Sequence, residues 1–354
     1  MNSTRWKVNN FDLLRIVAAT QVLVMHGIEH LNLSKPALQN ILSHFPGVPI
    51  FFVISGFLIS ASYERNPDLR SYFRNRALRI FPALWACLAF SIFLASVVGD
   101  VAFNNIELIP WLLAQVSFLQ FYNPDFLRSF GVGVLNGSLW TISVELQFYV
   151  ALPLIYRWLS GNPRNAILIT MTILLGALNF FILGDFFQQS LPRIFQKISQ
   201  VVLPTYLYLF LVGILIQRNY LSLQKYLEKN AIIWTFTYCV LSFSSTYFFS
   251  LKTGNEINPV LATLLAFTVV SWAVSWPNIS SRLLRTNDFS YGIYIYHMPI
   301  INTLIFLKLG GAKGFTFALA LTAICAILSW LLIERPMLRL KRNPLHAVKP
   351  SLNL

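Results

Sequence analysis

Long apolar stretches recur from one end of the chain to the other, and short polar connections separate them. Runs of about 20 apolar residues are long enough to cross the hydrocarbon core of a bilayer as helices. The pattern therefore predicts an all-α polytopic membrane protein. Its eleven apolar segments are 11–30, 45–62, 80–98, 108–122, 139–157, 165–184, 201–217, 231–249, 259–276, 291–307 and 314–333.

The segment 108–122 is the weakest of the eleven, because it is short and has Pro110 near its start. It also contains Gln115, Ser117 and Gln120. We expect this segment to be re-entrant or interfacial and buried against protein, since irregular backbone at membrane depth must be satisfied there. About ten transmembrane helices remain, which puts both termini on the same side.

The distribution of charge supports this topology. With a cytoplasmic N-terminus, 19 of the 27 Lys and Arg residues fall in inner loops, seven fall in outer loops, and Arg15 lies within the membrane. Cationic residues concentrate in short cytoplasmic loops of membrane proteins. The net charge of +14 thus reflects topology, and we expect no nucleic-acid partner.

We expect one membrane-embedded domain over 1–354, with a core of about 11–336. A short basic cytoplasmic tail, 337–354, is expected to rest on anionic lipid headgroups. The first apolar run is too long for a cleavable signal peptide. The three cysteines, Cys87, Cys239 and Cys325, lie in apolar runs without paired spacing, so neither a disulfide framework nor a metal site is indicated.

Two ionisable residues share one face of the first apolar segment. Arg15 and His26 are eleven positions apart, which is three helical turns plus 20°, or about 16 Å along the axis. Ionisable residues inside a membrane are costly and usually mark a pathway or a reacting site. The alternatives are a packing role for His26, and snorkelling or a pair with Asp12 for Arg15.

The segment 139–157 is unusually polar for a membrane span. Ser138, Thr141, Glu145 and Tyr149 follow helical spacing and line one stripe. Glu145 is expected at a depth similar to that of His26, where a carboxylate would raise the basicity of the imidazole for general-base catalysis on a hydroxyl group. The alternative for Glu145 is a hydrogen bond to a Ser or Thr of a neighbouring helix.

Further candidates lie in the inner loop 63–79 and in later spans. Arg74, Arg76 and Arg79 favour either a phosphate clamp or contacts with lipid headgroups. Ser55-Gly56 indicates close helix packing, or backbone that approaches a ligand. The predicted pocket-lining residues are Ser55, Trp140, Ser143, Tyr291, Tyr294 and His297, with Trp140, Ser143 and Tyr294 as candidate oxyanion donors.

These features occur in a fixed order along the chain. The segments are Arg15 and His26, FFVISGF (51–57), RALR (76–79), SLWTISVELQFY (138–149), YGIYIYHMP (291–299) and ERP (334–336). Together they resemble the transmembrane acyltransferases of the acyltransferase-3 type, over roughly Phe11 to Pro336.

The resemblance implies ten core helices in a bacterial inner membrane. It implies transfer of an acyl group, most often acetyl, from cytosolic acyl-CoA as co-substrate, with no tightly bound cofactor. The acceptor would be a hydroxyl group of a surface polysaccharide, such as exopolysaccharide or lipopolysaccharide, or of its lipid-linked precursor. His26 matches the essential histidine of the family, Arg15 its paired arginine, Arg76 and Arg79 its cytoplasmic RxxR, and Glu145 its essential carboxylate.

A mechanism follows from these expectations. Arg76 and Arg79, with Arg74, would bind the CoA phosphates, and the pantetheine arm would pass Arg15 to reach His26. Supported by Glu145, His26 would act as general base or form an acyl-imidazole, and the sequence favours neither. The alternative functions are a proton-coupled lipid or glycan transporter using His26 and Glu145, and a non-catalytic partner in glycan export.

Overall fold

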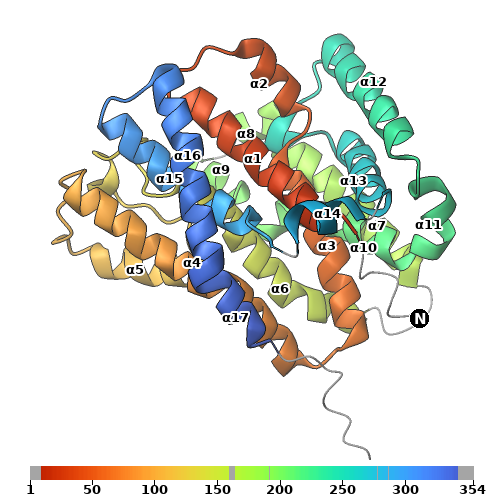
Figure 1. The fold of residues 1–354 in the computed structure, drawn as a ribbon. Coiled ribbons are helices and arrows are strands. Elements are labelled where there is room, and N and C mark those ends of the chain that lie inside the picture. The colour runs from red at the N-terminus through yellow and green to blue at the C-terminus, as the bar shows by residue number, and fades with distance from the viewer. Residues whose placement is uncertain (1–8, 159–163, 191, 277, 286, 342–354) are drawn as a thin grey trace, which may run out of the picture.

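All regular structure in the described part of the chain is helical (Figure 1). The computed structural model describes residues 9–158, 164–190, 192–276, 278–285 and 287–341. The long helices are α1 (Phe11–His30), α3 (Gly47–Arg65), α4 (Leu69–Val97), α6 (Trp140–Trp158), α7 (Arg164–Ile182), α10 (Leu203–Arg218), α12 (Ala231–Phe249), α13 (Pro259–Val274), α15 (Ser290–Phe306) and α16 (Gly311–Ser329). The all-α class is confirmed.

Short helices connect or cap these spans. They are α2 (Pro36–Ser43), α5 (Leu108–Val116), α8 (Asp185–Ser190), α9 (Arg193–Ser199), α11 (Tyr220–Leu227), α14 (Asn278–Leu284) and α17 (Arg335–Arg339). A π-helical turn, Trp330–Glu334, joins α16 to α17. The expected basic tail, 337–354, is described only as far as Lys341, and 342–354 lie outside the described residues.

The spans are consistent with a multi-pass membrane protein. In the described ranges, eight helical segments have the length and hydropathy of a membrane span, and the count is nine if α13 and α14, bent by 70°, are taken as one span. The remaining long helix, α15, has 17 residues. It packs between α1 and α16.

The segment 108–122 does not form a spanning helix, as expected. Within it, α5 has nine residues and is therefore about 14 Å long, roughly half the thickness of the hydrocarbon core. After α5 the chain turns, because the Gln115 side-chain amide donates to the carbonyls of Gln120 (3.2 Å) and Tyr122 (3.0 Å). Figure 1 shows α5 at the edge of the bundle opposite α11 and α12.

Two glycines let α3 and α10 cross at very short range. A Cβ atom on Gly56 would lie 2.1 Å from the Phe210 carbonyl oxygen, and one on Gly213 would lie 2.3 Å from the Val53 carbonyl oxygen. Small residues allow this approach between membrane helices. Of the two predictions for Gly56, close helix packing is therefore the one the structure supports.

Pro299 interrupts the hydrogen-bond ladder of α15 and thereby ties a loop to it. A proline has no N–H, so the carbonyl four residues earlier, that of Ile295, loses its helical donor. The Asn136 side-chain amide donates to this carbonyl at 2.8 Å, and Cys87 Sγ donates at 3.2 Å. The loop that precedes α6 is thus anchored on α15 near the middle of the bundle.

The glycine crossing generates a stability prediction. Gly56→Ala forces the α3 and α10 backbones apart, and overpacking of this kind costs about 1–3 kcal/mol. We expect a lower thermal unfolding temperature in detergent. Gly176→Ala is the matched control, because the nearest atom to a Cβ there is 3.4 Å away. Equal unfolding temperatures for the two variants would contradict the close crossing.

Candidate active site

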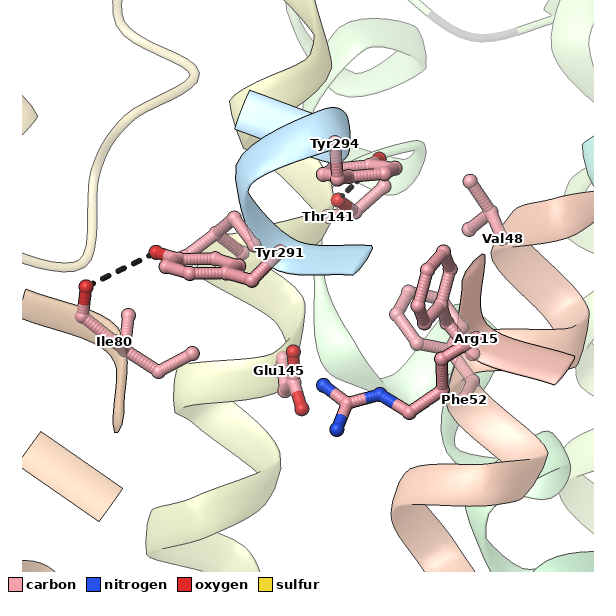
Figure 2. Close-up of a pocket in the computed structure, with 10 residues that line it drawn as sticks. Arg15, Val48, Phe52, Ile80, Thr141, Glu145, Tyr291 and Tyr294 are labelled. Atoms are coloured by element: carbon pink, nitrogen blue, oxygen red, sulfur yellow. Dashed lines mark hydrogen bonds between the residues drawn. The ribbon is translucent and has the colours of Figure 1, made fainter. Parts of the chain in front are cut away.

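A narrow cavity, partly open to solvent, lies among α1, α3, α4, α6 and α15. Its lining residues are Arg15, Val48, Phe51, Phe52, Ile80, Thr141, Ile142, Glu145, Tyr291 and Tyr294. Five of the residues singled out from the sequence therefore meet on one cavity: Arg15, Thr141, Glu145, Tyr291 and Tyr294. Figure 2 shows the Arg15 guanidinium pointing toward Glu145, with Tyr294 and Thr141 at the opposite end.

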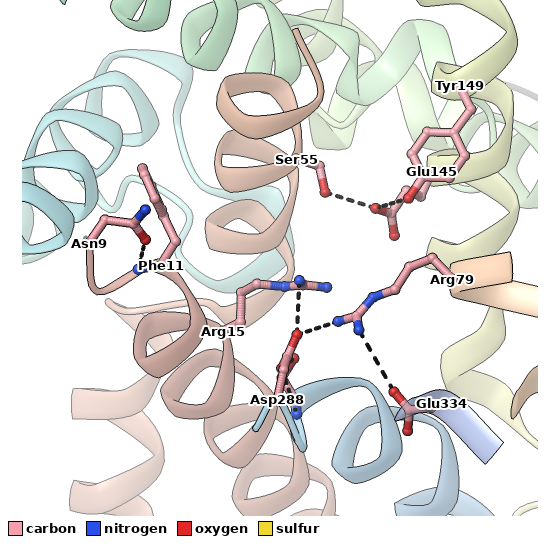
Figure 3. Close-up of polar contacts among 10 residues, drawn as sticks. Asn9, Phe11, Arg15, Ser55, Arg79, Glu145, Tyr149, Asp288 and Glu334 are labelled. Carbon is pink, nitrogen blue, oxygen red and sulfur yellow. Dashed lines mark hydrogen bonds and ion pairs between the residues drawn. The ribbon is translucent and has the colours of Figure 1, made fainter. Parts of the chain in front are cut away.

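A buried carboxylate, Asp288, joins two of the arginines at one end of this cavity (Figure 3). Its Oδ2 lies 3.1 Å from Arg15 Nη1 and also accepts a hydrogen bond from Arg79 Nη2. Its Oδ1 accepts the backbone N–H of Ser290 at 3.1 Å. Arg79 Nη1 lies 4.0 Å from Glu334 Oε2 as well. Arg15 thus pairs with Asp288 rather than with Asp12.

Sequence reasoning missed Asp288 because it resembles an ordinary turn residue. An Asp two residues before the first turn of a helix commonly accepts a backbone N–H there, and Asp288 does so ahead of α15. Burial opposes ionisation of the carboxyl, but Arg79 and Arg15 outweigh burial and hold the pKa of Asp288 well below its usual range. The carboxylate is therefore charged and compensates both cations.

Two further basic side chains, Arg76 and Lys341, lie near this end. Arg76 contacts the face of the Tyr149 ring, 5.9 Å from its centroid, and its Nε has no hydrogen-bond partner among the described residues. Arg74, in contrast, is exposed. Lys341 was expected only as part of the tail, yet burial, and then Arg79 and Arg76, lower the pKa of its amine to about 7.

His26 pairs with another histidine and not with a carboxylate. Its Nδ1 lies 2.9 Å from His297 Nε2, and the two rings stack at 5.1 Å between centroids. The prediction that Glu145 supports His26 is therefore wrong. Glu145 accepts hydrogen bonds from Ser55 Oγ (2.8 Å) and Tyr149 OH (2.7 Å). The alternative, a hydrogen bond to a serine of a neighbouring helix, is what the structure contains.

The end of the cavity toward the histidines is closed by a hydrogen bond between side chains. Tyr294 OH and Thr141 Oγ1 are 2.6 Å apart. The Tyr294 ring lies 5.5 Å from that of Phe51 and 5.9 Å from that of His297. Tyr294 therefore stands between the cavity and the imidazole pair.

Four of the six predicted lining residues do not line the cavity. Ser55 bonds to Glu145 and His297 to His26 next to it, whereas Trp140 and Ser143 contact other parts of the chain. Ser143 is fully buried and donates to the Gln120 side-chain oxygen, while the Trp140 ring packs on that of Tyr206 at 5.2 Å. The reason is helical periodicity, because position 143 lies about 200° around α6 from Glu145. Neither residue supports the oxyanion role considered from the sequence.

The buried charge cluster generates a stability prediction. Asp288→Asn keeps the shape of the side chain but leaves Arg15 and Arg79 short of a counter-charge. Breaking a buried ion pair in this way costs on the order of 3 kcal/mol. We expect a clear loss of thermal stability in detergent. Asp125→Asn, which removes an exposed pair with Arg128, is the control and should change nothing measurable; equal effects would refute the compensating role of Asp288.

Comparisons with known proteins agree with the motifs. The family model of an acyltransferase domain matches residues 8–334. Nodulation protein 10 of Rhizobium leguminosarum bv. viciae is 32% identical over 95% of this chain and 94% of its own length. An O-acetyl transferase of Shigella phage Sf6 is 27% identical over 94% of this chain and 96% of its own. The O-acetyltransferase OatA of Staphylococcus aureus (strain NCTC 8325 / PS 47) is 24% identical over 92% of this chain, which spans 56% of that protein. No solved structure matches. The chain is therefore a multi-pass membrane protein that belongs to the acyltransferase-3 family.

Proposed function

We propose that this protein is an O-acyltransferase that moves an acetyl group from acyl-CoA to a hydroxyl group of a surface polysaccharide or of its lipid-linked precursor. The proposal rests mainly on one arrangement: a cation cluster lies at one end of a narrow cavity, and an imidazole pair lies beyond Tyr294 at the other end. The printed names of two similar proteins, the phage O-acetyl transferase and OatA, support the O-acetyl part.

The cation cluster suits a donor that carries phosphate groups. Arg79 is engaged by Asp288 and Glu334, so Arg76 and Lys341 are the groups left to bind phosphate oxygens directly. Arginine presents a fork of N–H donors that matches phosphate geometry. We assign Arg79 mainly to holding Asp288, which differs from the phosphate clamp expected from RALR alone.

The spacing of the two ends suits the length of a CoA arm. Arg15 and His26 are about 16 Å apart along α1. The arm would lie past Arg15 and Glu145, and the thioester would reach His26 once the bond between Thr141 and Tyr294 opens. A narrow cavity favours a small acyl group such as acetyl.

The chemical step needs one base. His26 takes the proton of the acceptor hydroxyl, the hydroxyl oxygen attacks the thioester carbonyl, the C–S bond breaks, and the CoA thiolate recovers the proton. An acyl group carried transiently on His26 is also compatible with this geometry. An acid quench of the enzyme with labelled acetyl-CoA distinguishes the two, because only the second route leaves label on the protein.

We also propose an orientation. Lys and Arg are concentrated before α1, in the N-terminal part of α4 (Arg70, Arg74, Arg76 and Arg79) and after α16, which favours a cytoplasmic location for both termini. This puts the cation cluster at the face where acyl-CoA is made and His26 toward the opposite face, in a bacterial inner membrane. Surface polysaccharide precursors and membrane lipids are the remaining partners of the proposal.

The proposal makes a direct prediction about His26. His26→Ala should lower CoA release from acetyl-CoA, measured on purified protein with a glycan extract as acceptor, by about 10²–10⁴-fold, the usual contribution of a general base. His44→Gln, at a buried histidine bonded to Ser242 outside the cavity, should retain activity. Undiminished CoA release in His26→Ala would exclude the mechanism. Glycan transport that depends on a proton gradient and not on acetyl-CoA would favour a transporter.

Lys341 generates a prediction about pH. Its pKa is about 7, so the amine is charged at pH 6 and largely neutral at pH 8. If it binds a donor phosphate, the KM for acetyl-CoA should rise about three- to tenfold across that range. Lys341→Arg stays charged across this range and serves as the control. Any change of KM with pH in this variant comes from groups other than Lys341, whose charged neighbours are Arg79, Arg76, Arg15 and Asp288. Identical KM profiles for wild type and Lys341→Arg would rule out this role.

A further inference from the structure

Both ring nitrogens of His297 are engaged, and both contacts are short. Its Nδ1 lies 2.6 Å from the backbone carbonyl oxygen of Tyr294, and its Nε2 lies 2.9 Å from His26 Nδ1. The side chain is fully buried. The His297 ring therefore bridges the α15 backbone and the proposed base.

These two contacts have only one consistent assignment of protons when both imidazoles are neutral. A carbonyl oxygen can only accept, so His297 Nδ1 carries a proton. A neutral imidazole has one protonated nitrogen, which leaves a lone pair on His297 Nε2. That lone pair accepts from His26 Nδ1–H, and His26 Nε2 is then the nitrogen without a proton.

We propose that His297 is a positioning residue that holds His26 in the tautomer with a free Nε2 lone pair. The catalytic consequence rests on the proposed function, whereas the tautomer itself does not. When Nε2 takes a proton from the acceptor, His26 becomes an imidazolium, and its Nδ1–H makes a charge-assisted hydrogen bond to His297 Nε2. The same lone pair would serve equally in attack on the thioester.

The fold holds His297 in the orientation that this role needs. Its helix, α15, is anchored beside the loop before α6 through the Asn136 bond to the Ile295 carbonyl, and through Asn302, which donates to the carbonyls of Val134 and Leu135. The Tyr294 ring packs edge-on against the imidazole of His297. A support locked by packing and hydrogen bonds is what keeps a reacting group in place.

A neutral imidazole suits this location better than the carboxylate that orients histidine in other hydrolases and transferases. A carboxylate in an apolar bundle needs compensating partners, as Asp288 and Glu145 have here. With both imidazoles neutral, the pair of His26 and His297 needs no compensating partner. Charge appears only during the reaction, when His26 takes up the proton.

The first test reads the tautomer without any activity. The chain has five histidines, so nitrogen NMR on protein labelled at the histidine rings is tractable, and His26→Ala identifies the His26 signals. We expect a protonated Nδ1 and an unprotonated Nε2 for His26 in the wild type, and loss of this preference in His297→Ala. A protonated Nε2 on wild-type His26 would overturn the inference even if the protein proves to be an acyltransferase.

The second test measures the catalytic consequence. In a Ser-His-Asp triad, holding the histidine in the wrong tautomer costs about 10⁴-fold in kcat. For His297→Ala we expect kcat to fall by about 10²-fold or more, with the KM for acetyl-CoA within about twofold of wild type. His297→Gln places a carbonyl oxygen where Nε2 was, so its kcat should be at least about tenfold higher than that of His297→Ala.

The controls separate positioning from structure. His297→Leu fills the space without an acceptor and should behave like His297→Ala, while His44→Gln should match the wild type. Equal activity of the Gln and Leu variants would show that His297 only fills space, and would refute the inference. An inactive wild type with the expected tautomer would instead count against the proposed function alone.

Discussion

An ionisable group inside an apolar bundle must find its partners within the protein, and this constraint organises the structure. Arg15 and Arg79 share the carboxylate of Asp288 at one end of the cavity. His26 and His297 meet beyond Tyr294, past the other end. The Arg15–Asp288 contact joins the start of α1 to the residues just before α15, and the His26–His297 contact joins the two helices further along. The two helices therefore run parallel. Arg15 and His26 are about 16 Å apart along α1, and positions 288 and 297 are about 14 Å apart along α15 and the residues before it. Because the two lengths are similar, both contacts form in the same alignment of the two helices.

This register determines what the cavity can do. A charged network at one end is compensated and still leaves Arg76 and Lys341 for an anionic ligand. Beyond Tyr294 at the other end lies an imidazole pair, whose two rings bond to each other and which suits a proton transfer that starts from neutral groups. Glu145 faces the cavity between them, where hydrogen bonds from Ser55 and Tyr149 stabilise it. The carboxylate therefore shapes the passage and does not contact His26.

Irregular backbone is the second feature that the site requires. Pro299 frees a carbonyl in α15, and a side chain from the loop before α6 satisfies it. The non-spanning segment around α5 then supplies Gln120, which binds Ser143 on the far side of α6. The first contact ties the loop before α6 to α15, and the second ties the α5 segment to α6. Thr141 of α6 and Tyr294 of α15 meet at the end of the cavity.

Much of this protein was determined by its sequence alone. Hydropathy and charge placed the apolar segments and identified 108–122 as the one that does not cross, because each depends on local composition. Helical periodicity put Arg15 and His26 on one face, and the ordered motifs identified the family. Only the tertiary structure showed that His26 pairs with His297 and Arg15 with Asp288. It also showed that Glu145 bonds to Ser55 and Tyr149, and that Ser143 lies outside the cavity. The physical reason is that periodicity relates residues within one helix, whereas their depth and facing across helices depend on how the helices are offset and rotated when they pack.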